Sequence, residues 1–230
     1  MNKSQTIKII IPAYNEEASI ARVIKDIPPE VDEIIVVNNK STDRTKEVAL
    51  LAGAKVLDEV RLGYGYACLK GLDYLKENPC DIVVFLDGDY SDYPEQLTKL
   101  VEAIINDEVD FVIGSRVKHL REQGSMTPQQ IFGNWLAIFL MRILFKSKFT
   151  DLGPFRAIRH TTLQSINMQD KTYGWTVEMQ LKVLKYKIKY KEVPVMYRNR
   201  IGKSKVSGAI KGTIMAGVKI LGWIFKYSFK

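Results

Sequence analysis

The sequence predicts an α/β protein whose central sheet is mostly parallel and flanked by helices. Short β-branched runs alternate with segments of helical spacing through the first half of the 230 residues. This alternation is typical of right-handed β-α-β crossovers, which build parallel sheets. The strand segments are almost continuously apolar, as expected for strands that are buried on both faces. Hydrophobic residues make up 46% of the chain, which is enough for a substantial core.

The individual elements of this half follow from local patterns taken in chain order. β-branched runs predict the strands, and apolar residues three or four apart predict the helices between them. Pro28 and Pro29 end the first helix and Gly53 ends the second. The expected strands are 7–11, 34–37, 54–57, 83–86 and 111–113, and the expected helices are 20–27, 48–52, 66–76 and 94–105. This half of the sequence contains no Gly-x-Gly-x-x-Gly motif and no Gly-Lys-Ser/Thr phosphate loop, which weighs against a dinucleotide dehydrogenase or a P-loop enzyme.

Two apolar segments in the second half predict amphipathic helices. Residues 128–145 are rich in aromatic side chains, with charges confined to Arg142 and to Lys146 and Lys148 just beyond, and residues 209–229 carry lysines among apolar residues. Both segments are too short or too charged to span a bilayer, but both suit an interfacial helix whose cations meet anionic lipid. The same pattern also fits helices that cover the sheet or form a dimer contact.

The net charge of +8 is concentrated at the C-terminal end. Residues 181–230 hold thirteen Lys or Arg and one acid, Glu192, whereas the preceding 180 residues hold 21 basic and 25 acidic residues. This asymmetry predicts an anionic partner, namely a phosphorylated substrate, a lipid surface or nucleic acid. Cys68 and Cys80 lack metal-ligand spacing, and the first residues lack the apolar core of a signal peptide. We therefore expect a cytoplasmic protein, peripheral on the inner membrane face.

Asp87 and Asp89, separated by Gly88, directly follow the apolar strand 83–86. Open α/β sheets bind their ligands at the carboxyl ends of parallel strands. Two carboxylates this close repel each other unless a cation accompanies them, and Mg²⁺ and Mn²⁺ prefer oxygen ligands. The pair therefore suggests a divalent metal site, although Asp and Gly are also ordinary residues of a turn that ends a strand.

Polar loops after the other predicted strands complete a possible nucleotide site. The loop 13–17 follows the first strand and the loop 38–43 follows the second. A nucleotide needs its base recognised, its ribose hydroxyls hydrogen-bonded and its phosphates neutralised, and loops after three neighbouring strands can meet all three needs. Ordinary turns and helix caps would explain each loop separately, but not their combination.

Six short motifs occur in order along the chain: IPAYNE at 11–16, NKSTDRT at 39–45, DGD at 87–89, GSR at 114–116, DLGPFR at 151–156 and RIGKSK at 200–205. This ordered set resembles family 2 glycosyltransferases with the GT-A fold. In detail it looks like the branch that transfers a hexose to polyprenol or dolichol phosphate. The resemblance covers roughly residues 7–208.

The resemblance implies a nucleotide-sugar donor and a Mg²⁺ or Mn²⁺ cofactor held by Asp87 and Asp89. The residues implied to contact the donor are Pro12, Tyr14, Glu16, Asn39, Asp43, Asp87, Gly88 and Arg116. The catalytic candidates are Asp89, Asp151 and Glu178, the last two as a base or as ligands of the sugar. The residues implied to contact the acceptor or a phosphate are Arg156, Trp175, Arg200, Ser204 and Lys205, with Trp175 equally suited to the core.

Three functional hypotheses follow, in order of preference. The first is an inverting, metal-dependent hexosyltransferase that uses a UDP- or GDP-sugar and a polyprenyl phosphate acceptor. The second keeps the glycosyltransferase but gives it a soluble or lipid-linked alcohol acceptor in polysaccharide or glycolipid assembly. The third, a non-enzymatic nucleotide or nucleic-acid binding protein, ranks last, so we expect no nucleic-acid partner. We expect a catalytic domain at 1–208, with a nucleotide-binding half at 1–116 and an acceptor-binding half at 117–208, and a basic helix at 209–230.

Overall fold

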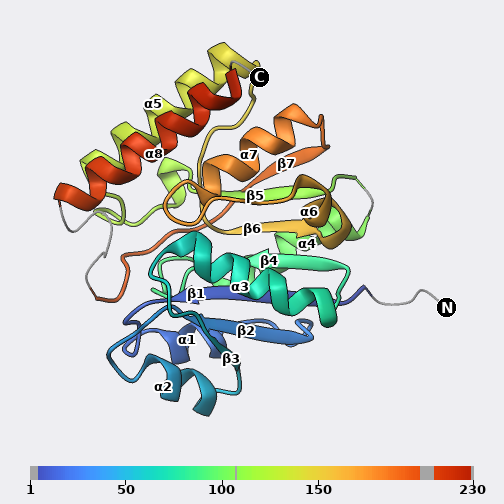
Figure 1. Cartoon of the computed structure of the whole chain (residues 1–230), viewed down its shortest axis with the longest axis vertical. Coiled ribbons are helices and arrows are strands. Elements are labelled where there is room, and N and C mark those ends of the chain that lie inside the picture. The colour runs from blue at the N-terminus through green and yellow to red at the C-terminus, as the bar shows by residue number, and fades with distance from the viewer. Residues whose placement is uncertain (1–4, 107, 203–209, 229–230) are drawn as a thin grey trace.

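The structure is a computed structural model that describes residues 5–106, 108–202 and 210–228, without the side chains of residues 210–214. At its centre lies a seven-stranded sheet with the strand order β3-β2-β1-β4-β6-β5-β7 (Figure 1). The strands are β1 (Ile7–Ala13), β2 (Glu33–Asn38), β3 (Lys55–Asp58), β4 (Ile82–Phe85), β5 (Phe111–Ser115), β6 (Arg156–Arg159) and β7 (Tyr190–Pro194).

The strand directions make the sheet mostly parallel. β3, β2, β1 and β4 run parallel to one another, and β5 pairs in parallel with the edge strand β7. β6 lies antiparallel to both of its neighbours, β4 and β5. The prediction of a mostly parallel sheet flanked by helices is therefore confirmed. β6 and β7 were not predicted from the sequence. β6 has only two apolar residues, which stand between Arg156 and Arg159, and Lys191 and Glu192 interrupt the apolar pattern of β7.

Helices cover both faces of the sheet. They are α1 (Ile20–Lys25), α2 (Thr45–Leu51), α3 (Tyr64–Glu77), α4 (Leu97–Ile105), α5 (Pro128–Phe145), α6 (His160–Ile166), α7 (Trp175–Lys185) and α8 (Ile210–Ser228), with 3₁₀ turns η1 (Pro94–Gln96) and η2 (Lys118–Leu120). One hydrophobic cluster joins the sheet to α3, α6 and α7, and the other joins it to α1, α2 and α4. Within β1, Ile10 packs in the first cluster, while Ile9 and Ile11 pack in the second.

α5 and α8, the two amphipathic helices predicted for the second half, are both present and lie side by side at one end of the molecule (Figure 1). α5 begins with a capping box in which Thr127 and Gln130 each satisfy the other's backbone N–H. Along α5 the buried residues are Ala137, Ile138 and Met141, so most of the helix is not core. In the described part of the chain, we find no helix long and apolar enough to cross a bilayer.

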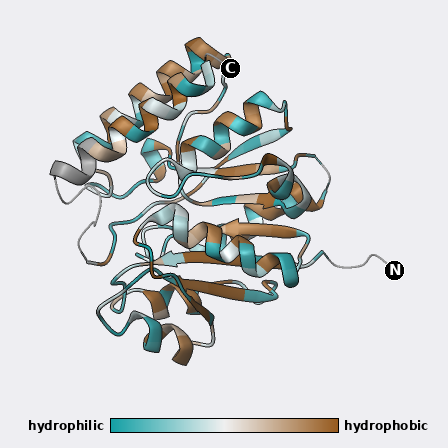
Figure 2. Ribbon diagram, viewed as in Figure 1, coloured by the Kyte–Doolittle hydropathy of each residue, from teal (hydrophilic) through white to brown (hydrophobic). Residues whose placement is uncertain are grey.

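Apolar and polar residues alternate along both of these helices (Figure 2), and several of the large apolar side chains are exposed. The largest are Ile131, Phe132, Trp135, Phe139, Ile143 and Leu144 on α5 and Met215, Val218 and Phe225 on α8. On α5 the ring of Trp135 stacks on that of Phe139, with 5.6 Å between centroids. A contiguous apolar surface of this kind marks an interaction site more often than a bare solvent face.

α8 is fastened to the body of the protein through the buried carboxylate of Asp170. The indole N–H of Trp223 donates to Asp170 Oδ2 at 2.6 Å, and Lys219 Nζ lies 3.3 Å from the same oxygen. The other oxygen of Asp170 accepts hydrogen bonds from the backbone N–H groups of Thr172 and Gly174. One carboxylate thus joins α8 to the loop that precedes α7.

We expect Trp223→Phe to lower the free energy of unfolding by about 1–2 kcal/mol, because a buried carboxylate oxygen loses its indole donor while the aromatic ring volume is largely kept. Phe225→Leu on the exposed face of α8 is the matched control and should change stability by less than about 0.5 kcal/mol. Urea unfolding followed by fluorescence or circular dichroism measures both. Equal stability of the two variants would show that the indole hydrogen bond does not hold α8.

Candidate active site

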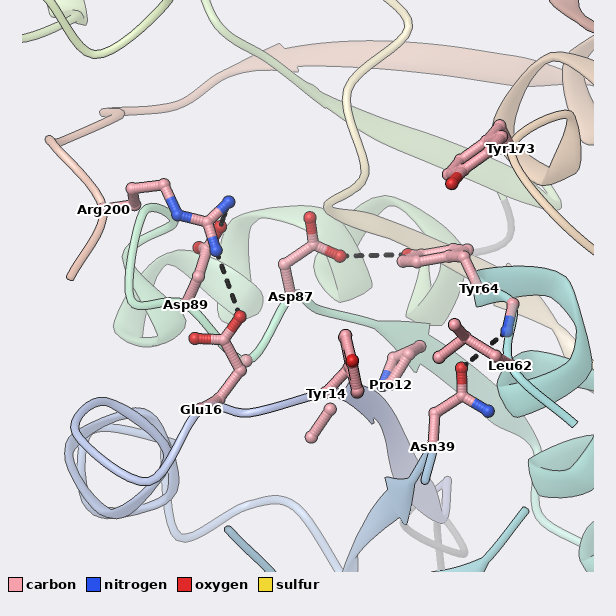
Figure 3. A pocket seen from close by; sticks show the side chains of 13 residues that line it. Pro12, Tyr14, Glu16, Asn39, Leu62, Tyr64, Asp87, Asp89, Tyr173 and Arg200 are labelled. Atoms are coloured by element: carbon pink, nitrogen blue, oxygen red, sulfur yellow. Dashed lines mark hydrogen bonds and ion pairs between the residues drawn. The ribbon is translucent and has the colours of Figure 1, made fainter. Parts of the chain in front are cut away.

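A cavity of about 210 Å³ opens at the carboxyl ends of β1, β2 and β4, as the parallel topology predicts (Figure 3). Its lining is Pro12, Ala13, Tyr14, Glu16, Asn39, Leu62, Gly63, Tyr64, Asp87, Gly88, Asp89, Tyr173 and Arg200. We call this the donor cavity. It brings together eight of the residues singled out from the sequence, from four separate stretches of chain.

Asp87 lies in the middle of the donor cavity, between Tyr64 and the group around Asp89 (Figure 3). The phenol O–H of Tyr64 donates to Asp87 Oδ1 at 3.0 Å. Burial, and then the nearby negative charge of Asp89, raise the pKa of Asp87 to about 7. Two carboxylates in this setting are unfavourable without a compensating positive charge.

Arg200 supplies such a charge from a distant part of the chain. Its guanidinium contacts Asp89 Oδ2 at 2.9 Å and Glu16 Oε1 at 3.0 Å, so it bridges the loops after β4 and β1 (Figure 3). The other oxygen of Asp89 accepts from the backbone N–H and the hydroxyl of Ser91, at 2.9 and 2.5 Å. The backbone N–H of Ile201 donates to the Asp89 carbonyl at 2.9 Å. The segment around residue 200 is thereby held against the Asp-Gly-Asp turn.

The loops after β1 and β2 support each other. The Glu16 N–H donates to Thr45 Oγ1 at 2.7 Å, and the Thr45 N–H donates to Asp43 Oδ1 at 3.0 Å. Burial of Asp43 would raise its pKa, but the hydrogen bonds from Thr45 outweigh it and the pKa is lowered. Asp43 does not line the donor cavity itself. It positions Thr45, which in turn binds the backbone of Glu16 in the cavity wall.

Asn39 holds the far wall of the donor cavity in place. Its Nδ2 donates to the Arg61 carbonyl at 2.7 Å, and its Oδ1 accepts from the Gly63 N–H at 2.8 Å (Figure 3). A side chain at Gly63 would collide with the Lys171 carbonyl, and one at Gly65 would collide with the Asp170 carbonyl. These close approaches pack the start of α3 against the loop that carries Tyr173.

Arg116 and Asp151 form an ion pair outside the donor cavity. Arg116 binds the two carboxylate oxygens of Asp151 through Nε and one terminal nitrogen, each at 2.8 Å. Burial of Asp151 raises its pKa, but the Arg116 charge and hydrogen bonds outweigh this and lower it. A carboxylate held this way is a poor general base, because a base needs an open position and a pKa near that of the solution. Arg116 lines a second cavity and not the donor cavity, and its expected contact with the donor stays a prediction.

Three further sequence candidates are buried in the body of the protein. Glu178 is fully buried, lies 2.7 Å from Lys182 Nζ and accepts from two backbone N–H groups. Arg156 is also fully buried and donates to several backbone carbonyls, and burial lowers its pKa to about 10. Trp175 is 1% exposed and packs edge-on against Phe85. None of the three lines the donor cavity or the second cavity that Arg116 lines, so their expected roles as base, phosphate ligand and sugar platform stay predictions that these positions do not favour.

Ser204 and Lys205, the remaining two acceptor candidates, lie outside the described residues. Sequence reasoning in turn missed Tyr64 and Tyr173, which line the donor cavity. Gly63 and Gly65, which flank Tyr64, were the local signal for that residue. Asp92 was missed as well: within the described residues its carboxylate oxygens are buried without a hydrogen-bond partner, and burial raises its pKa well above the usual value.

The donor cavity suits a divalent metal that takes part of its coordination from a substrate. In the described ranges no group of three or more His, Cys, Asp or Glu side chains is arranged to hold a metal. Asp87 and Asp89 nevertheless offer carboxylate oxygens in one cavity, and Mg²⁺ is commonly held by one or two carboxylates together with substrate phosphates. Burial is the main cause of the raised pKa of Asp87, and a cation beside this carboxylate would favour its ionised form.

Comparison with known families finds a match to the model of "Glycosyl transferase family 2" over residues 8–166. An undecaprenyl-phosphate mannosyltransferase of Micrococcus luteus is 32% identical over 223 residues, which cover 91% of this chain and 90% of that protein. A UDP-N-acetylglucosamine–dolichyl-phosphate N-acetylglucosaminyltransferase of Methanococcus voltae is 30% identical, covering 82% of this chain and 84% of that protein. These matches support the predicted resemblance to the polyprenol-phosphate branch.

Solved structures give the fold. Glucosyl-3-phosphoglycerate synthase from Mycobacterium tuberculosis, in complex with Mn²⁺, UDP-glucose and phosphoglyceric acid, superposes with a TM-score of 0.80 at 23% identity, covering 98% of this chain and 80% of that one. The same enzyme in complex with Mg²⁺ and UDP gives a TM-score of 0.76 at 22% identity, with the same coverage. The predicted GT-A fold is confirmed.

We expect Arg200→Ala to bind Mn²⁺ about three- to tenfold more tightly than the unaltered protein when no nucleotide is present. The Arg200 guanidinium contacts Asp89 Oδ2 and repels a cation, and a unit charge a few ångströms away in a water-like medium is worth ~1 kcal/mol. Arg44→Ala removes an exposed arginine from a surface pair with Glu47 and should leave Mn²⁺ affinity unchanged. Calorimetric titration with Mn²⁺ distinguishes the two variants. Equal or weaker Mn²⁺ binding by Arg200→Ala would refute competition between the guanidinium and the metal.

Proposed function

The chain belongs to glycosyl transferase family 2, and we propose that it moves a hexose from a nucleotide-diphosphate sugar to a polyprenyl phosphate. The observation that carries the proposal is the convergence of Asp87 and Asp89 with the loops after β1 and β2 in one cavity. The polyprenyl phosphate acceptor is supported by the names of relatives about 30% identical over most of the chain.

The donor would lie across the donor cavity. Pro12 and Tyr14 would flank the base and ribose at one end, and the diphosphate would lie beside Asp87 and Asp89. Mg²⁺ or Mn²⁺ held by these carboxylates would, when bound, stabilise charge on the departing diphosphate as a Lewis acid. Arg200 would exchange its contacts with Glu16 and Asp89 for phosphate oxygens, for which a guanidinium is well shaped.

Transfer to a phosphate needs little help from a protein base. An oxygen of the acceptor phosphate, already ionised at neutral pH, attacks the anomeric carbon while the bond from that carbon to the diphosphate breaks. The electron pair of the broken bond leaves with the nucleoside diphosphate, and the anomeric configuration inverts. The placement of Asp151 and Glu178 in buried ion pairs is consistent with this acceptor, whereas an alcohol acceptor would require a protein base.

The protein would work as a peripheral protein on the inner face of the membrane. Neither α5 nor α8 contains an acidic residue, and their exposed surfaces combine apolar side chains with Arg142, Lys219 and Lys226. Interfacial helices bind lipid surfaces through this combination of apolar area and positive charge. Binding of α5 and α8 to the membrane surface would bring the protein to a water-insoluble acceptor.

We expect purified protein with Mn²⁺ to transfer hexose from a UDP- or GDP-sugar to undecaprenyl phosphate, and Asp89→Asn to lower the rate on the order of 100-fold, because a ligand of the charge-stabilising metal is weakened. Chelation with EDTA should have a similar effect. Asp73→Asn, which alters an exposed pair on α3, is the control and should retain full activity. Scintillation counting of the lipid-extracted product follows the reaction.

The chemical stability of the product identifies the acceptor. A glycosyl phosphate is labile to mild acid, whereas a glycoside of an alcohol resists it. A stable product would therefore replace the phosphate acceptor with an alcohol, and undiminished transfer by Asp89→Asn would rule out the proposed metal site.

A further inference from the structure

A second cavity, of about 260 Å³, lies between the paired helices α5 and α8. We call it the interhelical slot. Gly133 and Leu136 line it from α5, Gly217 and Ile220 line it from α8, and Arg116 reaches it from the end of β5. It shares no lining residue with the donor cavity. Most of its exposed wall is apolar, and its polar lining residues are Arg116, Gln129, Gln130, Asn134 and Thr176.

Glycine on each helix keeps the interhelical slot open. A side chain built at Gly133 or at Gly217 would meet no atom within 4 Å. Glycine is an unfavourable residue inside a helix, so these two positions do not serve helix formation. They also do not serve close packing, because the space beside each Cα is unfilled. The two glycines therefore leave space in the slot between α5 and α8.

Arg116 lines the interhelical slot at the end of β5 and is held there by two neighbours. Asp151 binds one edge of its guanidinium, and the ring of Tyr197 lies 5.2 Å from the guanidinium carbon, so the group is held in a defined orientation. Tyr197 in turn forms a β-bridge with Asp92, just past the Asp-Gly-Asp turn, so its ring links Arg116 to that turn. A phosphate close to Arg116 would consequently be near the centre where the donor sugar is expected.

We infer that the interhelical slot binds the first isoprene units of the lipid acceptor, with the acceptor phosphate at the Arg116 end. This inference rests on the proposed function and adds the site and the shape of the acceptor. A single slender hydrocarbon chain bearing an anionic group matches an apolar slot with one cation at its wall. The acid-free helices on either side favour such an anion, and the exposed side chains of Phe132 and Trp135 offer the rest of the chain a path to lipid.

Filling the interhelical slot tests the inference directly. Gly133→Leu and Gly217→Leu add a side chain into open space, so the fold and the melting temperature should be kept. Gly222→Leu is the matched control, because Gly222 is exposed on α8, also has no atom within 4 Å of its Cβ position and does not line the slot. The probe is farnesyl phosphate, a single-chain isoprenoid phosphate, titrated calorimetrically in dilute detergent. Nucleotide binding is measured on the same samples with UDP and GDP in the presence of Mn²⁺.

We expect the two slot variants to bind farnesyl phosphate at least tenfold more weakly than the unaltered protein, and Gly222→Leu to bind it normally. All three should bind the nucleotide as the unaltered protein does. Normal farnesyl phosphate binding by both slot variants, or none by the unaltered protein, would overturn the inference. An equal loss of affinity for phosphatidylglycerol vesicles would also overturn it, because the slot would then serve membrane lipid in general.

The same experiment separates this inference from the proposed function. If farnesyl phosphate binds in a slot-dependent way and no prenyl phosphate accepts sugar from any nucleotide sugar, the proposed function fails and the lipid site stands. If transfer to undecaprenyl phosphate occurs equally in Gly133→Leu, Gly217→Leu and Gly222→Leu, the proposed function stands and the lipid site fails.

Discussion

The repulsion between two carboxylates at the end of a buried strand is the constraint on which the donor cavity depends. β4 is apolar on both faces, so it places Asp87 and Asp89 where water cannot screen them fully. Hydrogen bonds and an ion pair stabilise the two carboxylates. Tyr64 donates a hydrogen bond to Asp87, whereas Asp89 accepts one from Ser91 and pairs with Arg200. Because Arg200 comes from beyond the last strand, charge compensation also joins the two halves of the chain.

Much of the fold and the donor side of the site could be predicted from local patterns. Parallel strands end at one edge of a sheet, so residues after β1, β2 and β4 had to meet once the strands were recognised. This is why Pro12, Glu16, Asn39 and the Asp-Gly-Asp turn all line the donor cavity. The same rule could not place Tyr173, because the loop that carries it reaches the cavity through its packing against the glycines at the start of α3.

The other half of the site could not be predicted because residue type does not reveal burial. Arg156, Trp175 and Glu178 are chemically suited to bind a phosphate, a sugar and a proton, yet all three are buried. β6 explains part of this outcome. It enters the sheet antiparallel between β4 and β5, so Arg156 at its start is enclosed by backbone carbonyls and not exposed at an edge. An antiparallel insertion has no signature in a four-residue strand with two arginines.

The positions of the two cavities suggest how one small domain could join a water-soluble donor to a lipid acceptor. The donor cavity is polar at its carboxylates and is formed by loops of the sheet, whereas the interhelical slot is apolar and is formed by two helices with exposed apolar surfaces. Arg116 lines the interhelical slot, and its guanidinium is held by Asp151. Because the two cavities share no lining residue, the nucleotide sugar would enter its cavity from water and the lipid acceptor would enter the slot from the membrane. The acceptor oxygen and the anomeric carbon would then meet at the Arg116 end of the slot.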